Sequence, residues 1–277
     1  VYWVEVGSGR RRRIALRSAP VDVGPDVRRC LFERFPSVIL TSATLSCGSD
    51  QEGFNFFASR VGLENFDAVQ LGSPFDYARQ VTVYVEADLP PPTLDNFEPA
   101  AAAAIEKYLL MSDGRAFVLF TSYTMLRRLA ERLEDFLAEQ HMEMLVQGGG
   151  LDRAVLLERF KADARSVLFG TDSFWQGVDV PGEALSNVII VRLPFAVPNH
   201  PLIQGRIEHL RAQGQNPFYT YQLPTAILRF KQGFGRLIRN KTDTGIIVVL
   251  DSRIVTRPYG RLFLEALPPC RVEIVER

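Results

Sequence analysis

An α/β fold, with a mostly parallel sheet covered by helices on both faces, is the architecture that this sequence predicts. Short β-branched and aliphatic runs alternate with longer helical patterns along most of the 277 residues. The short runs are apolar throughout, as expected of strands that are buried on both faces. A chain of 277 residues is long enough for one large α/β domain, or for one domain with an extension.

Six segments have the composition of buried strands: residues 38–41, 81–85, 117–120, 167–170, 188–191 and 246–250. Six others have helical patterns: residues 99–111, 122–140, 153–161, 201–212, 225–240 and 258–267.

The first 37 residues differ from the remainder. Two strand-like pieces flank the basic run at 10–13, which we interpret as a hairpin turn in preference to a DNA contact. Residues 88–99, with three consecutive prolines, resemble a linker. We therefore expect an N-terminal segment of residues 1–85 and a compact domain of residues 86–277. The start at Val1, on an apparent strand, suggests a piece of a longer protein.

Composition excludes several classes of protein. Lys+Arg and Asp+Glu both total 32, so net charge gives no support for nucleic-acid binding, which must be argued from local sites. Cys30, Cys47 and Cys270 lie far apart, which argues against a zinc site or a disulfide framework and fits a reducing, cytoplasmic compartment. We therefore expect no bound metal in this chain. Since no run of 18 apolar residues exists, we expect no membrane partner.

Several predicted strands end in polar or glycine-containing loops. These loops are residues 41–44, 121–123, 171–182 and 251–253. Ligands of open α/β sheets gather at the carboxyl ends of strands, so we expect these loops to converge on one edge.

The segment ILRFKQGFGRLIR, residues 227–239, carries the strongest chemical signal. On a helix, one arc would be apolar and would pack on the sheet: Ile227, Phe230, Phe234, Leu237 and Ile238. The opposite arc would be polar: Arg229, Gln232, Arg236 and Arg239.

Two glycines inside this predicted helix, Gly233 and Gly235, each cost about 1 kcal/mol relative to alanine. Such costs suggest a close backbone approach, which a polyphosphate would supply. Arginine forks bind phosphate oxygens and stabilise charge during phosphoryl transfer, and a glutamine there could orient the γ-phosphate or the attacking water. The alternative for an isolated amphipathic helix is a solvated, salt-bridged face.

The loop after residues 167–170 has donors that suit a phosphate. Thr171 and Ser173 can donate to a phosphate oxygen, and Gly177 permits an unusual turn. Asp179 could accept a ribose hydroxyl or brace an arginine. Trp175 could stack on a base, although a tryptophan so near a strand end is more often part of the core.

These residues together resemble the XPD/DinG-like branch of superfamily 2 DNA helicases, and the bacterial DinG-like members most closely. The matching segments run through most of the chain in helicase order: 41–45 (TSATL, motif III), 117–123 (FVLFTSY, motif IV), 173–182 (SFWQGVDVPG, motif V) and 232–239 (QGFGRLIR, motif VI). Leu193-Pro194-Phe195, followed by Pro198 and Pro201, also matches the DinG-like pattern.

The resemblance implies a RecA-like (P-loop NTPase-like) second motor domain that closes over ATP held by a first domain. Arg236 and Arg239 would act as arginine fingers, with Gln232 beside them. Residues near the nucleotide would be Gly177, Asp179 and Gly235.

The resemblance also implies contacts to single-stranded DNA and to the upstream motor domain 1 of the same polypeptide. The DNA contacts would come from Thr121, Ser122, Thr171, Ser173 and Trp175. Ser42 and Thr44 would couple the two domains, and residues 1–85 would form the junction to motor domain 1.

The chain also departs from the complete family pattern. It has no G-x-x-x-x-G-K-[ST] phosphate loop and no Asp-Glu pair, so ATP with Mg²⁺ would be bound mainly by the upstream domain. Any iron–sulfur cluster would also lie upstream, because this chain lacks the four cysteines. We therefore expect the C-terminal half of an ATP-dependent DNA helicase, without ATPase activity of its own.

Two other interpretations stay open. A degenerate helicase fold could bind nucleic acid or a protein partner without catalysis. An unrelated nucleotide-binding α/β enzyme is less favoured, because no G-x-G-x-x-G follows a strand and the three histidines (His141, His200, His209) form no acid–base set with a nucleophile.

Overall fold

The structure is a computed structural model of residues 1–277, and it describes all of them except 8–12, 49–50, 176–179, 181–183, 198–199 and 277. The chain forms two compact units. The first comprises Val1–Gln70 and Phe195–Leu228, and the second comprises Leu71–Pro194 and Arg229–Arg277.

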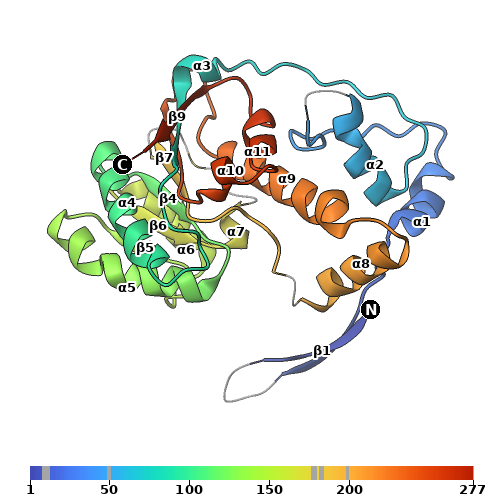
Figure 1. Cartoon of the computed structure of the whole chain (residues 1–277), viewed down its shortest axis with the longest axis horizontal. Helices are drawn as coiled ribbons and strands as arrows, with labels where there is room; N and C mark the ends of the chain where they lie inside the picture. The colour runs from blue at the N-terminus through green and yellow to red at the C-terminus, as the bar shows by residue number, and fades with distance from the viewer. Residues whose placement is uncertain (8–12, 49–50, 176–179, 181–183, 198–199, 277) are drawn as a thin grey trace. The chain divides into compact units, whose positions relative to one another are not determined.

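A seven-stranded sheet is the centre of the second unit (Figure 1). The strand order is β5-β6-β4-β7-β8-β3-β9, and every pairing is parallel. The strands are β3 (Val81–Glu86), β4 (Ala116–Leu119), β5 (Met144–Val146), β6 (Val167–Gly170), β7 (Asn187–Ile190), β8 (Gly245–Val249) and β9 (Arg271–Val275). The predicted parallel α/β fold is confirmed.

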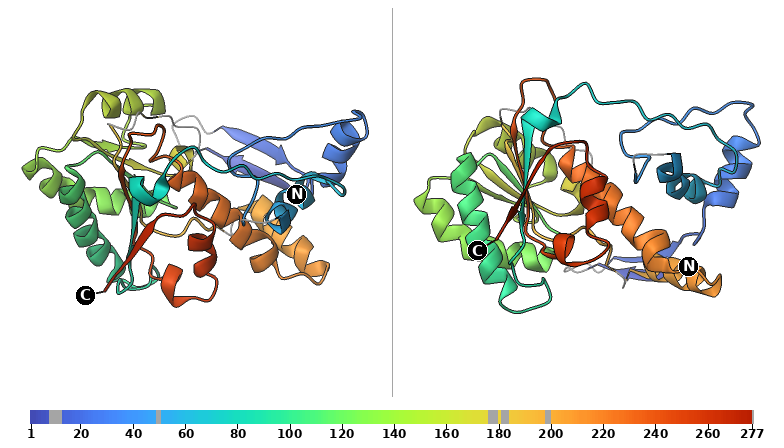
Figure 2. Two further views of the ribbon diagram at one scale, coloured as in Figure 1. Left: turned by 90° about the horizontal axis from the view of Figure 1, so that it is seen from above. Right: turned by 45° about the horizontal axis from the view of Figure 1, so that its top comes forward.

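Helices cover both faces of this sheet, because alternate residues of the central strands point to opposite sides. On one face, Val118 and Phe120 join a core made with α4 (Phe97–Ser112) and α5 (Tyr123–Glu139). On the other face, the Phe117 ring lies 4.7 Å from that of Phe160 on α6 (Arg153–Ala162). Figure 2 shows α4 and α5 in green on one side of the sheet and α11 in red on the other.

The remaining helices that lie wholly within the second unit are short. They are α3 (Tyr77–Gln80), α7 (Asp172–Trp175), α10 (Arg253–Thr256) and α11 (Arg261–Glu265). The chain division falls within α9 (Leu223–Phe234), whose last six residues belong to this unit.

Sequence analysis missed two of the sheet strands. Strand β5 has only three residues, and β9 at the sheet edge has exposed or half-buried side chains, with Arg271 and Glu273 among its apolar residues. Strand β5 is apolar but too short to be recognised from composition, and β9 lacks the continuous apolar run that is typical of buried strands. Strand β3, which the predicted boundary at residue 85 separates from the compact domain, pairs with β8 and β9. The sheet therefore begins before that boundary.

The first unit opens with an antiparallel hairpin. Strands β1 (Tyr2–Val6) and β2 (Ile14–Ser18) pair from Tyr2↔Ser18 to Val6↔Ile14, as expected for a hairpin, although most of its turn lies outside the described residues. The unit also contains α1 (Gly24–Val27), η1 (Arg28–Phe32), η2 (Gln51–Phe54), α2 (Asn55–Val61), α8 (Pro201–Ala212) and η3 (Phe218–Gln222).

The strand predicted at residues 38–41 is wrong for this structure. The segment has no regular secondary structure and pairs with no described strand, and the Ile39 side chain is 85% exposed. An apolar run indicates a strand only where a partner supplies ladder hydrogen bonds. Among the described helices, none is long and apolar enough to cross a membrane.

Candidate functional site

The loops that follow β5, β6, β4, β7 and β8 leave the sheet at one edge, because all these strands are parallel. Backbone hydrogen bonds extend the ladder into the loops: Phe120 N–H donates to Gly170 O at 2.8 Å, and Val191 N–H donates to Leu119 O at 3.1 Å. Leu250 N–H likewise donates to Ile190 O at 3.0 Å. The polar loops that sequence analysis selected in this unit therefore do converge.

A glutamine that sequence analysis overlooked connects three of these loops. Gln147 Oε1, after β5, accepts from the backbone N–H of Thr171 at 2.7 Å and from its hydroxyl at 3.0 Å. Gln147 Nε2 donates to the Tyr123 hydroxyl at 2.6 Å. The sequence gives little indication of this role: Gln147 follows a short apolar run and precedes a glycine. The structure shows why a glycine follows, because Gly148 has a φ of 85°, which favours glycine.

Two of the predicted nucleic-acid contacts have structural roles. Thr171 is only 5% exposed, and its hydroxyl already donates to Gln147. Ser122 is the N-cap of α5, and its Oγ accepts from the Met125 N–H at 3.3 Å. Thr121, which directly precedes Ser122 just beyond the end of β4, is half-buried. Ser122 therefore combines a capping role with a position at the predicted edge.

Trp175 is part of the core and does not face a ligand. Its indole is 2% exposed, and Nε1 donates to Phe120 O at 3.1 Å. A base cannot stack on a ring in this position, so the predicted stacking contact is wrong and the packing alternative holds. Gly177 and Asp179 lie outside the described residues, and the side chain of Ser173 is not described.

The predicted helix over residues 225–240 ends early. Helix α9 stops at Phe234, and the next hydrogen bonds, Arg236 N–H to Gly233 O and Leu237 N–H to Phe234 O, both at 3.2 Å, are tighter i→i−3 turns. Beyond the turn, the Asp243 carboxylate accepts from the Arg239 N–H at 2.8 Å. Two glycines weaken the helix, and Asp243 stabilises the alternative. Arg236 and Arg239 therefore do not share a helical arc with Gln232.

Gly233 is needed for packing against Trp175. A Cβ at this position would meet two carbons of the indole at 3.0 and 3.1 Å. The close approach that the glycine pair suggested is therefore to an aromatic ring, at least at Gly233, and not to a polyphosphate. Gly235 lies just beyond the helix end and is half-buried.

Arg236 points to the start of the loop that was predicted to bind nucleotide. Its guanidinium donates to Trp175 O through Nε at 3.2 Å and through Nη2 at 2.9 Å, and the side chain is half-buried. Gln232 is also half-buried, whereas Arg239 is exposed. The structure thus places Arg236 at the carboxyl edge near β6, and its predicted role as an arginine finger stays a prediction.

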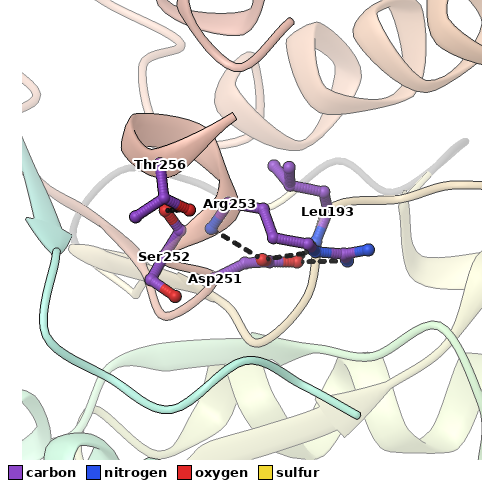
Figure 3. Close-up of polar contacts among 5 residues, drawn as sticks. All are labelled: Leu193, Asp251, Ser252, Arg253 and Thr256. Carbon is purple, nitrogen blue, oxygen red and sulfur yellow. Dashed lines mark hydrogen bonds and ion pairs between the residues drawn. The ribbon is translucent and has the colours of Figure 1, made fainter. Parts of the chain in front are cut away.

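A second polar cluster lies at the ends of β7 and β8 (Figure 3). Asp251 is fully buried, and it accepts from Leu193 N–H at 2.8 Å. It also accepts from Arg253 through the backbone N–H at 3.2 Å, Nε at 2.8 Å and Nη2 at 2.6 Å. These hydrogen bonds raise the pKa of Arg253. Asp251 therefore joins the two loops.

Ser42 and Thr44 occupy a turn in the first unit. Thr44 N–H donates to Ser42 Oγ at 3.2 Å, and the two hydroxyl oxygens lie 3.4 Å apart. The Ser42 side chain is exposed. Their predicted role in coupling two motor domains stays a prediction.

The described residues contain no group of three or more His, Cys, Asp or Glu side chains that could hold a metal ion. Cys30, Cys47 and Cys270 are all free thiols.

Comparison with known proteins shows the family to which this chain belongs. Residues 105–270 match the family described as "Helicase C-terminal domain". The ATP-dependent DNA helicase YoaA of Escherichia coli (strain K12) is 40% identical over 268 residues, covering 97% of this chain and 41% of the relative. The protein named 3'-5' exonuclease DinG of Bacillus subtilis (strain 168) is 38% identical over 278 residues, covering 98% of this chain and 29% of the relative.

A solved structure titled "XPD_Helicase" has the same fold, with a TM-score of 0.64 at 18% identity. It is matched over 86% of this chain and 43% of its own length. This chain thus spans less than half the length of these relatives.

Proposed function

The chain belongs to the family of helicase C-terminal domains, and from that premise we propose that it is the second motor half of an ATP-dependent DNA helicase. In this proposal, an upstream domain of the same polypeptide holds ATP and Mg²⁺. This chain contributes side chains that stabilise the transferring phosphoryl group and others that hold single-stranded DNA.

The position of Arg236 is the observation that carries this proposal. Its guanidinium lies against Trp175 O, at the carboxyl edge near β6, where the loop resembling motif V begins. A guanidinium supplies only donors and a glutamine amide supplies two N–H donors beside its carbonyl oxygen, so Arg236, Arg239 and Gln232 suit the oxygens of a triphosphate. Gly177, Asp179 and Gly235 would lie near the same nucleotide. Bound ATP would supply the phosphoryl group, and the arginines would neutralise its charge.

The exit of β4 is the best-supported DNA contact. Thr121 and Ser122 directly follow a buried strand at the same edge as Arg236, and a serine that caps a helix through its oxygen can still donate its own proton. Thr171 is less favourable, because its hydroxyl would first have to leave Gln147. Ser173 completes the proposed set, and Ser42 and Thr44 would transmit closure to the upstream domain.

Replacement of Arg236 tests the catalytic part of the proposal. In the full-length polypeptide, Arg236→Ala should lower DNA-stimulated ATP turnover by about 10³–10⁵, the contribution typical of an arginine finger. Turnover is measured by phosphate release at saturating ATP and DNA. Affinity for a fluorescent ATP analogue should change far less than turnover.

The control is Arg261→Ala, which removes an exposed guanidinium of α11. Near-normal turnover in Arg236→Ala would refute the assignment. A second test is the 277-residue chain alone, which should hydrolyse no ATP above background.

A further inference from the structure

The carboxyl ends of β7 and β8 bring two arginines to one carboxylate. Ile190 pairs with Val249 in the ladder, and the contact between Leu193 N–H and Asp251 continues it to the loops at 2.8 Å. Arg192 directly precedes Leu193 in the same unit and interacts electrostatically with Asp251 and Arg253. Figure 3 shows the contacts of Leu193, Asp251 and Arg253.

Asp251 already forms an ion pair with Arg253. The carboxylate is fully buried, and Arg253 reaches both of its oxygens, at 2.8 and 2.6 Å. In this bidentate ion pair, the negative charge of Asp251 offsets the positive charge of Arg253. Asp251 also acts electrostatically on Arg192, but one carboxylate faces two guanidinium groups, so the three side chains together keep one positive charge.

Arg192 has no ion-pair partner of this kind among the described residues. Its side chain is half-buried, and no hydrogen bond or ion pair joins it to any residue that the structure describes. Burial lowers the pKa of Arg192, and the positive charge of Arg253 lowers it further. The other nearby carboxylate, Glu98, is paired with Arg128 at 3.0 Å. The cluster therefore has an uncompensated positive charge in partly buried surroundings, where an incoming anion would be stabilised.

The neighbouring loop indicates which anion fits. Val191 N–H donates to Leu119 O, so the end of β7 adjoins the end of β4, where Thr121 and Ser122 follow. Arg236, by contrast, contacts the loop after β6, two strands from β7, or roughly 10 Å at the usual strand spacing of about 4.8 Å. An anion at Arg192 is thus close to the proposed DNA contacts and separate from the proposed ATP phosphates.

We propose that Arg192, with Arg253 beside it, binds a backbone phosphate of single-stranded DNA. This rests on the proposed function, and it extends the DNA contact from the β4 loop across the ends of β7 and β8. Arginine presents a planar fork that matches phosphate oxygens. Arg192 supplies the unmatched charge, while Asp251 holds Arg253 in place.

The test is binding of a fluorescent oligothymidylate to the full-length protein by anisotropy, over a series of salt concentrations. Arg192→Gln should weaken binding about tenfold, equivalent to about 1.4 kcal/mol. The slope of log affinity against log salt should fall by about 0.7, the loss expected for one phosphate contact on a single strand. Arg192→Lys should keep the slope, because it keeps the charge.

Arg132→Gln, an exposed position on α5, is the matched control and should alter neither quantity. Affinity for a fluorescent ATP analogue should be unchanged in Arg192→Gln. Unaltered DNA affinity and slope would overturn the inference, as would a loss confined to ATP binding. Failure of the unmodified protein to bind the oligonucleotide would instead overturn the proposed function itself.

Discussion

At one edge of the same sheet, described residues that follow β5, β6 and β4 form a network of neutral hydrogen-bonding groups, whereas those that follow β7 and β8 form a cluster of charged groups. In the first region, Gln147 joins Thr171 and Tyr123 through hydrogen bonds between neutral groups. In the second region, Arg192 and Arg253 flank the single buried carboxylate of Asp251. The first arrangement needs no ligand to be stable, and the second retains a positive charge.

This difference separates polar residues that hold the loops together from polar residues that are candidates for binding a ligand. A hydroxyl next to a strand end suggests a ligand contact in either region, yet that of Thr171 is used by the fold. A half-buried guanidinium without a partner is a stronger indication, because burying charge costs free energy that the fold has not offset.

The largest effect is expected at Asp251. Asp251→Asn should lower the free energy of unfolding by about 3–5 kcal/mol, because it leaves Arg253 uncompensated and turns an amide donor toward a guanidinium. Denaturant titration measures this change. Glu265→Gln, in the exposed pair with Arg261 at 4.0 Å, is the control and should change stability by less than about 0.5 kcal/mol. A loss below about 1 kcal/mol would mean that Asp251 is not the group that holds the β7 and β8 loops together.

A smaller effect is expected at Gln147. Gln147→Ala should cost about 1–3 kcal/mol, because the buried N–H and hydroxyl of Thr171 both lose their acceptor. Tyr123→Phe removes only the outer hydrogen bond, at a largely exposed ring, and should cost less. Thermal unfolding of the two variants gives the comparison. If Tyr123→Phe proved the more harmful change, the described network would not be what stabilises this region.

The smallest effect is expected at Ser122. Ser122→Ala should cost about 1 kcal/mol through loss of the α5 cap, and Ser122→Asn, which can cap, should restore most of it. Both variants are compared by denaturant titration. On the DNA, loss of one neutral hydroxyl should weaken binding less than Arg192→Gln does, since neutral hydrogen bonds are weaker than charge-assisted ones. A larger loss of DNA affinity at Ser122 than at Arg192 would reverse the ranking of the two regions.

The central strands could be predicted because a strand that is buried on both faces consists almost entirely of apolar residues. Strands β4, β6, β7 and β8 appear as apolar runs, and β6 was located at its observed bounds, Val167–Gly170. The segment at 38–41 has a similar composition but no partner strand among the described residues. Apolar character marks a segment that can be buried, and only the neighbouring strands decide whether it joins a sheet.

The end of α9 shows a second limit. Helical periodicity placed Arg236 and Arg239 on one face, but the helix ends at Phe234. The competing hydrogen bonds come from Asp243, only four residues after Arg239, so a local polar turn outweighs the helical periodicity. Trp175 also looked ambiguous until its acceptor, Phe120 O, was located 55 residues earlier in the chain.

The sequence by itself determined the parallel α/β architecture, the edge at which its polar loops meet and the family to which the chain belongs. These follow from local composition and short motifs, which a chain carries wherever it is placed. Only the tertiary structure decided which polar groups are already satisfied: Thr171 by Gln147, Arg253 by Asp251, and Arg192 by no described residue. Satisfaction depends on atoms brought within about 3 Å from distant parts of the chain, and no local pattern records that distance.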